Sequence, residues 1–243
     1  MLAVLSVELR KLNRSLAPVL VLAGPGLVAL LTFFIVLNGR RATPWDRLME
    51  GVSGVWAVFL LPMSVTALTA LVAQIEHGPR AWDHLRALPV PRWRFYAAKA
   101  ICAVALVVIM TALTLLLGWA SAAAAITLKP AVAPPAALDL SKLLLLNGKV
   151  VIAALLLIAI QLWTALRFSS FVPALALGIG GTFFSVMATR AKARVFSPWQ
   201  MPFNMFSPEA WRVDTALALA LGGGLGAMAL VAVVLHLARR EVL

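Results

Sequence analysis

The charged side chains in residues 76–99 are the first candidates for chemistry, because the sequence on either side of them is almost entirely apolar. Gly78 and Pro79 predict a turn into a new helix, since proline is tolerated in a first helical turn, where its missing N–H is not needed. The helix ends at Pro89, and Pro91 follows. Its residues divide into an apolar face and a charged face: Trp82, Leu85 and Leu88 on one, and Arg80, Asp83, His84 and Arg86 on the other. Such a helix presents a surface on which a partner protein can act.

Catalytic and metal-binding patterns are weak by comparison. An intramembrane enzyme needs ionisable side chains that face one another within the spans, but here the acidic residues fall at span ends or in loops. The histidines have no metal-ligand spacing with Cys102 or with one another, which favours solvated or interfacial roles: His77, His84 and His236. The chain also has no Gly-x-x-x-x-Gly-Lys-Ser/Thr phosphate loop. We therefore expect neither a catalytic site, nor a metal, nor a cofactor bound by this chain.

Composition places the chain in a membrane. Hydrophobic residues make up 63% of the 243 residues, and the mean hydropathy is +0.97. One soluble core cannot hide so much apolar surface, so the bilayer must take it. The net charge of +12 comes from basic residues that lie between long apolar runs. Anionic lipid headgroups are therefore favoured over nucleic acid as the partner of this charge.

Six apolar runs are each long enough for a helix to cross the hydrocarbon core, and in lipid each must be a helix because its backbone has to satisfy its own hydrogen bonds. The sequence thus predicts one all-α polytopic membrane domain over residues 1–243. The spans are residues 16–37, 51–75, 100–126, 143–166, 171–188 and 213–237. Gly24-Pro25-Gly26 and Pro62 should loosen the first and second spans. The Gly222-x-x-x-Gly226 pattern predicts close packing of the last span against another helix.

Residues 2–14 predict a helix that lies in the membrane interface. Its apolar stripe is Leu2, Leu5, Leu9 and Leu12, and its polar side is Glu8, Arg10, Lys11 and Arg14. Arg92, Arg94 and Lys99 are interpreted as interfacial anchors before the third span.

Two single charges keep alternative interpretations. Glu76 either marks the membrane boundary with its carboxylate in headgroup water, or anchors the helix that follows at its positive N-terminal end. Lys149, near Asn147 in the fourth run, is either a snorkelling lysine near the outer end of its helix or a polar residue of a transport path.

Residues 189–211 form the most aromatic segment outside the spans, and three prolines there exclude one continuous helix. An interfacial aromatic belt explains Trp199 and Trp211. The alternative is a broken, partly re-entrant hairpin that caps the outer mouth of a path, formed by Phe196, Trp199, Phe203 and Phe206.

The order of these elements resembles that of ABC-2 type transporter permeases. Gln74-Ile-Glu76-His-Gly, Trp82-x-x-Leu85-Arg-Ala-Leu-Pro89-Val-Pro-Arg92, Phe95-Tyr-Ala-Ala-Lys99 and Phe196-Ser-Pro-Trp-Gln-Met-Pro202 are similar to segments of the lantibiotic-immunity and bacitracin-export permeases. The positive-inside rule does not fix the orientation, because 11 basic residues fall on one side and 10 of the 21 on the other. The resemblance implies a bacterial cytoplasmic (inner) membrane with both termini in the cytoplasm.

The resemblance further implies a permease subunit of an exporter, with ATP bound and hydrolysed by a separate ABC ATPase subunit. Glu76 and the loop would form the coupling helix on that ATPase, with Arg80, Trp82, Leu85, Arg86 and Leu88 as contact residues. A second permease chain, identical or paralogous, would complete the path. The expected cargo is an amphiphilic peptide or a similar antimicrobial. The alternative function is a membrane-embedded scaffold or assembly factor without transport, which copurification with an ATPase would distinguish.

Overall fold

The computed structural model describes residues 1–77, 90–135, 137–206 and 214–239. Throughout these residues the regular structure is helical, with no strand. Six helices are long and apolar enough to cross a membrane, at Ala17–Leu37, Trp45–His77, Trp93–Leu128, Leu140–Arg167, Val172–Arg190 and Thr215–Arg239. The predicted fold class and number of spans are confirmed.

The α-helices are, in chain order, α1 (Leu2–Asn13), which precedes the first span, and then α2 (Ala17–Leu37), α3 (Trp45–Val55), α4 (Leu61–His77), α6 (Trp93–Leu128), α7 (Leu140–Ala153), α8 (Leu155–Arg167), α9 (Val172–Met187), α10 (Thr215–Leu219) and α11 (Gly226–Arg239), which build the spans. The second and third spans begin at Trp45 and Trp93, earlier than the predicted residues 51 and 100. The reason is that each helix starts with a polar turn or two, which hydropathy alone excludes from a span.

Two of the spans contain a π-helical turn partway along their length. A π-helical turn at Trp56–Leu60 separates α3 from α4 directly before Pro62, because proline cannot supply the N–H of a regular turn. A second π-helical turn at Ala220–Leu225 separates α10 from α11. α2 continues through Pro25 without a break in its assignment.

The glycines of the last span allow two helices to approach closely. A Cβ atom built on Gly222 would meet the backbone of Ala153, and one on Gly226 would meet the backbone of Leu155 and Leu156. These contacts lie where α7 ends and α8 begins. The predicted close packing of the Gly222-x-x-x-Gly226 pattern is therefore confirmed, and its partner is the fourth span.

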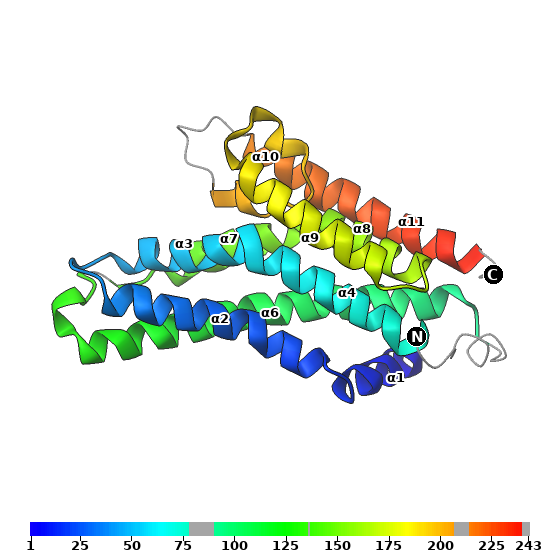
Figure 1. The fold of residues 1–243 in the computed structure, drawn as a ribbon, viewed down its shortest axis with the longest axis horizontal. Helices are drawn as coiled ribbons and strands as arrows, with labels where there is room; N and C mark the ends of the chain where they lie inside the picture. Colours follow the sequence, from blue (N-terminus) through cyan, green and yellow to red (C-terminus); the bar gives the residue numbers. More distant parts are fainter. Residues whose placement is uncertain (78–89, 136, 207–213, 240–243) are drawn as a thin grey trace.

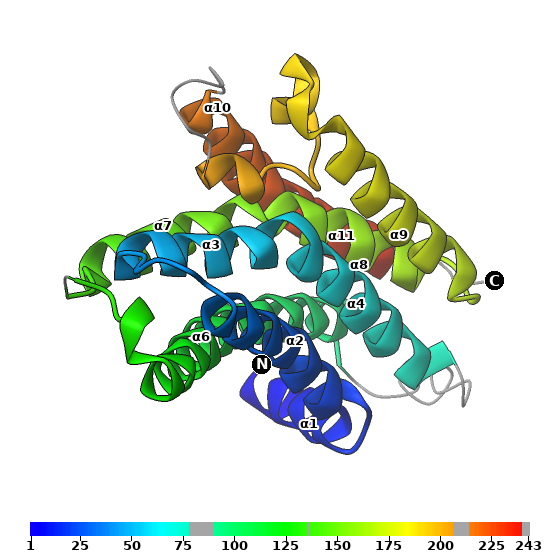
Figure 2. The same ribbon diagram turned by 60° about the vertical axis from the view of Figure 1, so that its left-hand side comes forward.

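The spans lie side by side along the long axis of the molecule (Figure 1). α2 packs along α6, α4 packs on α8 and α9, and α11 packs on α8 and α6. The short helix α1 lies at one end of the molecule, where it contacts α6 and α2 (Figure 2). The ends of α4 and α11 and the start of α6 are at this same end (Figure 1).

The orientation of α1 differs from the predicted one. Glu8, on the predicted polar side, is 3% exposed, and Leu12 is 5% exposed beside it on the packed face. Leu2 and Leu9, in the predicted apolar stripe, are exposed on the single chain. Glu8 was predicted on the polar side of an interfacial helix, but it is turned into the bundle because Lys99 of α6 pairs with it.

Candidate functional site: an ion cluster joining three helices

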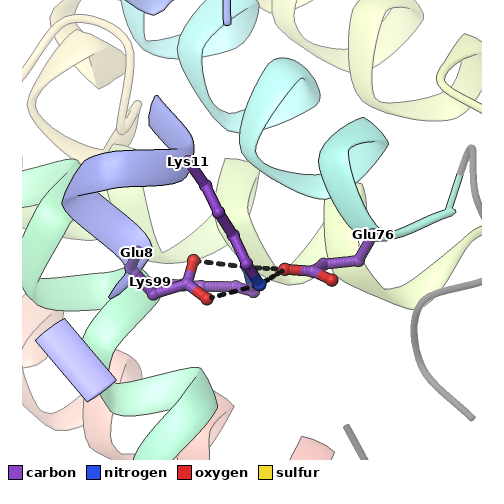
Figure 3. Close-up of polar contacts among 4 residues, drawn as sticks. All are labelled: Glu8, Lys11, Glu76 and Lys99. Carbon is purple, nitrogen blue, oxygen red and sulfur yellow. Dashed lines mark hydrogen bonds and ion pairs between the residues drawn. The ribbon is translucent and has the colours of Figure 1, made fainter. Parts of the chain in front are cut away.

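Four charged side chains from three helices meet at the α1 end of the molecule. Glu8 and Lys11 come from α1, Glu76 from the last turn of α4, and Lys99 from the second turn of α6. Figure 3 shows their side chains converging from the three helices. The spacing of Glu8 and Lys11 brings both toward the same neighbours, since residues three apart share a helix face.

The contacts within this ion cluster are direct. Lys99 Nζ lies 2.7 Å from Glu8 Oε2 and 3.0 Å from Glu76 Oε1. Lys11 Nζ lies 2.8 Å from Glu76 Oε1 and 3.3 Å from Glu8 Oε1. Each lysine therefore donates to both carboxylates, and each carboxylate contacts both lysines.

Three of the four charged side chains are buried, so their ion pairs hold α1, α4 and α6 together. Glu8, Glu76 and Lys99 are 3%, 0% and 1% exposed, whereas Lys11 is only partly buried. Two negative and two positive charges make the cluster neutral, which is the condition under which buried charges are tolerated. The second oxygen of Glu76, Oε2, has no hydrogen-bond partner among the described residues. Moving any one of the three helices away would leave a buried charge without its partners.

Lys11 is the member of the cluster that reaches the solvent. Partial burial pulls the pKa of its ammonium down, but hydrogen bonds and charge from Glu76 and Glu8 outweigh that effect and hold the pKa above its ordinary 10.5. Lys11 is thus fully charged at neutral pH, and it shields the cluster on its open side.

The structure decides between the two interpretations of Glu76 in one respect. Its carboxylate is fully buried against Lys11 and Lys99, so the expectation of a carboxylate in headgroup water was wrong. Glu76 is followed, after His77, by the segment for which the coupling helix is predicted. The other predicted coupling residues, Arg80, Trp82, Leu85, Arg86 and Leu88, lie outside the described residues.

Sequence reasoning missed the partners of Glu76. Lys99 was expected at the interface, but α6 begins at Trp93, and Lys99 is buried in its second turn. An ionisable residue inside an apolar helix indicates a paired or functional charge, and this signal was available once the helix start was placed correctly. Glu8 carried no comparable signal, since an acidic residue on a surface helix is ordinary.

The predicted outer residues lie at the opposite end of the molecule from the ion cluster. Phe203 and Phe206 stack with ring centroids 6.4 Å apart. They line a groove of about 820 Å³ together with Lys149 and the ion pair of Glu50 and Lys142. Lys149 is exposed on the single chain, not buried in the fourth span. The structure therefore brings together three of the residues that the sequence assigned to an outer path.

Irregular backbone at residues 188–206 folds onto the spans at this end. Short 3₁₀ turns at Ala188–Arg190, Lys192–Phe196 and Phe203–Phe206 replace a continuous helix. The Trp199 ring packs so closely on Gly181 of α9 that no Cβ atom would fit there. Gln200 is fully buried and donates a hydrogen bond to the Ser185 carbonyl of α9. Phe196, by contrast, is 64% exposed, so it does not belong to the packed part of the predicted cap.

No three histidine, cysteine, aspartate or glutamate side chains of the described segments are grouped so that they could hold a metal ion. The described residues thus offer a neutral ion cluster between helices at one end and a groove with charged side chains at the other.

Comparison with known proteins gives one finding. The sequence profile described as ABC-2 family transporter protein matches residues 4–185, which is well over half of the chain. No curated protein and no solved structure matches. Members of this family are transmembrane subunits that work with a separate ABC ATPase subunit, and the matched residues include most of α1 and all four residues of the ion cluster. The chain belongs to the ABC-2 transporter family, as a membrane permease of an ABC exporter.

Proposed function

We propose that this chain is the permease of an exporter that moves an amphiphilic peptide or a similar antimicrobial out of the bacterial cytoplasmic membrane. ATP is hydrolysed by the separate ATPase subunit, and both chain termini lie in the cytoplasm. A second permease chain, identical or paralogous, encloses the path. The similarity to the lantibiotic-immunity and bacitracin-export branch supports this choice of cargo.

The observation that carries the proposal is the position of the ion cluster. Glu76 lies two residues before the segment that begins at residue 78, for which the coupling helix is predicted, and its carboxylate is held by Lys11 and Lys99. A force that the ATPase applies to that segment reaches the end of α4 first. Because the cluster ties α4 to α1 and α6, the three helix ends move as one unit.

A hinge for such movement is present in the second span. The π-helical turn Trp56–Leu60 and Pro62 interrupt the regular ladder between α3 and α4, and such interruptions are where helices bend. Beyond this turn, α3 lines the outer groove that contains Lys149, Phe203 and Phe206. Movement of α4 about the π-helical turn would thus change the shape of the outer groove. In this way ATP hydrolysis on the cytoplasmic side acts on the cargo on the outer side.

Uncoupling by one side-chain change tests this role. Glu76→Gln keeps the shape of the side chain but removes the charge that both lysines share. Losing one buried charge should make the variant less stable, so export is compared at equal amounts of assembled complex; at that amount we expect most export to be lost and ATP hydrolysis no longer to be stimulated by cargo. Glu50→Gln is the matched control, because Glu50 forms an exposed ion pair with Lys142 at the opposite end, where a single pair contributes little.

The assay is export from reconstituted vesicles that contain the permease and the ATPase copurified in mild detergent. Full export by Glu76→Gln, with cargo-stimulated ATP hydrolysis intact, would show that the cluster does not couple the subunits. A wild-type complex that contains the ATPase but moves no amphiphile would favour the scaffold function instead.

A further inference from the structure

A groove of about 540 Å³ lies between α2 and α3, toward the end of the molecule opposite the ion cluster. Its walls are apolar: Val28, Leu31 and Ile35 on α2, and Leu48, Val52 and Val55 on α3. Leu31 and Ile35 are exposed on the single chain, so the groove opens sideways along the helices. An open apolar groove along two spans fits an extended hydrocarbon chain.

Three arginines stand at one end of this groove. Arg40 and Arg41 follow the end of α2, and Arg47 lies in the first turn of α3. All three are exposed, and none forms an ion pair with an acidic side chain of the described residues. The carbonyl groups of Leu37 and Gly39 are already bonded by Lys129 Nζ, at 3.1 and 2.8 Å. The arginines are therefore not needed to complete the end of α2.

The acidic residues nearest in the sequence are already engaged. Asp46 accepts a hydrogen bond from the backbone N–H of Asp139 at 3.1 Å, and Glu50 pairs with Lys142 at 3.1 Å. No acidic residue of the described segments lines the groove. The charged residues that line it are all arginines, so this end of the groove is complementary to an anion.

The length of the groove matches one leaflet of a bilayer. Its lining on α2 runs from Val28 to Val36, which is about 12 Å at the rise of an α-helix, and it continues past the helix end through Gly39 to Arg40 and Arg41. Half of a hydrocarbon core of about 30 Å is about 15 Å. The arginines then stand at the depth of the headgroups, while the apolar walls cover the acyl region.

We propose that this groove is a binding site for a membrane lipid with a phosphate headgroup, with the phosphate at Arg40, Arg41 and Arg47 and one acyl chain along α2 and α3. Guanidinium groups bind phosphate through paired, charge-assisted hydrogen bonds. A cationic peptide is repelled by the same three charges, so a cationic cargo uses another surface. Placing the lipid in the outer leaflet rests on the proposed orientation of the exporter, but the binding itself does not.

The groove can be filled without disturbing the fold. Gly51 of α3 lines it, and a Cβ atom added there meets no atom within 4 Å. Gly51→Leu should therefore fold normally and occupy the space of the acyl chain. Gly148→Leu is the matched control, because Gly148 is also an exposed helical glycine with open space around it and does not line this groove.

The test uses the full chain in nanodiscs of zwitterionic lipid doped with a photoactivatable probe. One probe is phosphatidic acid and the other is phosphatidylcholine with identical acyl chains. We expect phosphatidic acid to label residues 28–55 preferentially, as mapped by mass spectrometry. The triple change Arg40→Gln, Arg41→Gln and Arg47→Gln should reduce this labelling at least about tenfold, as the loss of several charge-assisted bonds predicts. Lys149→Gln, which removes an exposed charge that lines a different groove, should leave it unchanged.

Equal labelling by both probes, or labelling that survives the triple arginine variant and Gly51→Leu, would overturn the proposal. So would displacement of the lipid probe by millimolar inorganic phosphate alone, which would indicate an anion site without a lipid chain. Cross-linking between two copies through a cysteine at Ile35, with lipid labelling absent, would assign the groove to a second chain. The measurement needs neither ATPase nor export, so a chain that binds the probe but exports nothing refutes only the proposed function.

Discussion

Replacing Lys99 with methionine should destabilise the helical bundle strongly, because it leaves two buried carboxylates to share one lysine. Lys99 is 1% exposed and contacts Glu8 at 2.7 Å and Glu76 at 3.0 Å. Methionine has similar length and is apolar, so the change removes charge more than volume. In the variant, Lys11 is the single cation left beside Glu8 and Glu76, so the cluster carries a net charge of minus one.

The size of the effect follows from these distances. At an effective dielectric constant of about 20, each contact is worth about 6 kcal/mol of attraction. Taking charges out of water offsets much of this, at several kcal/mol per ion. What remains on removing one partner of a buried ion pair is a loss of about 3–5 kcal/mol. We therefore expect Lys99→Met to lower the free energy of unfolding by about that amount.

A second variant separates charge balance from the loss of a side chain. Glu8→Gln combined with Lys99→Met removes one charge of each sign and leaves the Lys11–Glu76 pair at 2.8 Å intact. The double variant should recover at least about 2 kcal/mol relative to the sum of the two single changes, because the cluster is neutral again. Lys142→Met, at the exposed pair with Glu50, is the control and should change little.

Stability can be measured by steric trapping in bicelles or by reversible unfolding in mixed micelles, with proteolysis of α1 as a local readout. If Lys99→Met unfolds at the same free energy as the wild type, or if the double variant is as unstable as the two single changes added together, the cluster is not an interdependent unit, and the argument for coupling through it fails.

Three further outcomes are expected. Gly222→Leu should lower the unfolding temperature in detergent by the equivalent of about 1–3 kcal/mol through collision with the Ala153 backbone, whereas Gly224→Leu, whose Cβ meets open space, should not; equal effects would exclude the packing argument. Docking of α1, followed by hydrogen exchange, should be constant from about pH 6 to about pH 9, because the raised pKa of Lys11 gives stability that is complete below its ordinary 10.5 and is lost only as the pH rises through the higher folded value; loss of protection within this range would contradict that assignment. Trp199→Ala should impair export at normal protein level and ATPase assembly, because the ring fills the space over Gly181, while Phe196→Ala at the exposed position should not; export that is unchanged by Trp199→Ala would reduce the segment to a surface connection.

The spans could be predicted from the sequence because the bilayer imposes a simple rule on length and polarity. The ends of the spans could not, because the first turns of α3 and α6 are polar. Asp46 and Glu50 in α3, and Arg94 and Lys99 in α6, are helical residues that a hydropathy window excludes. Placing the start of the third span too late had a further consequence. Lys99 was predicted as an interfacial anchor, whereas it is a buried residue within α6.

The ion cluster could not be predicted for a different reason. Glu8 and Lys99 are 91 residues apart in the chain, and nothing in their local sequence links them. The pattern of α1 predicted an apolar stripe in the membrane interface and a polar side that included Glu8, but Glu8 is buried together with Leu12 of the stripe. The local sequence pattern predicts how α1 would lie if lipid and water were its only neighbours. Ion pairs with distant residues such as Lys99 turn Glu8 into the protein, while Leu2 and Leu9 stay exposed to lipid.

The two ends of the molecule differ in a way that bears on the proposed direction of energy transfer. At the α1 end, the cations of the cluster are paired, so displacing them separately is costly and the helix ends move together. At the opposite end, Arg40 and Arg41 are exposed and pair with no acidic side chain of the described residues, so they can change partners at little cost. A transporter that is pushed at one end and changes its binding affinity at the other needs one rigid end and one deformable end. The rigid end transmits the displacement, and the deformable end responds to it with altered binding. The proposed direction, from the ATPase at the cluster toward the opposite end of the molecule, is therefore the one that the charge distribution favours.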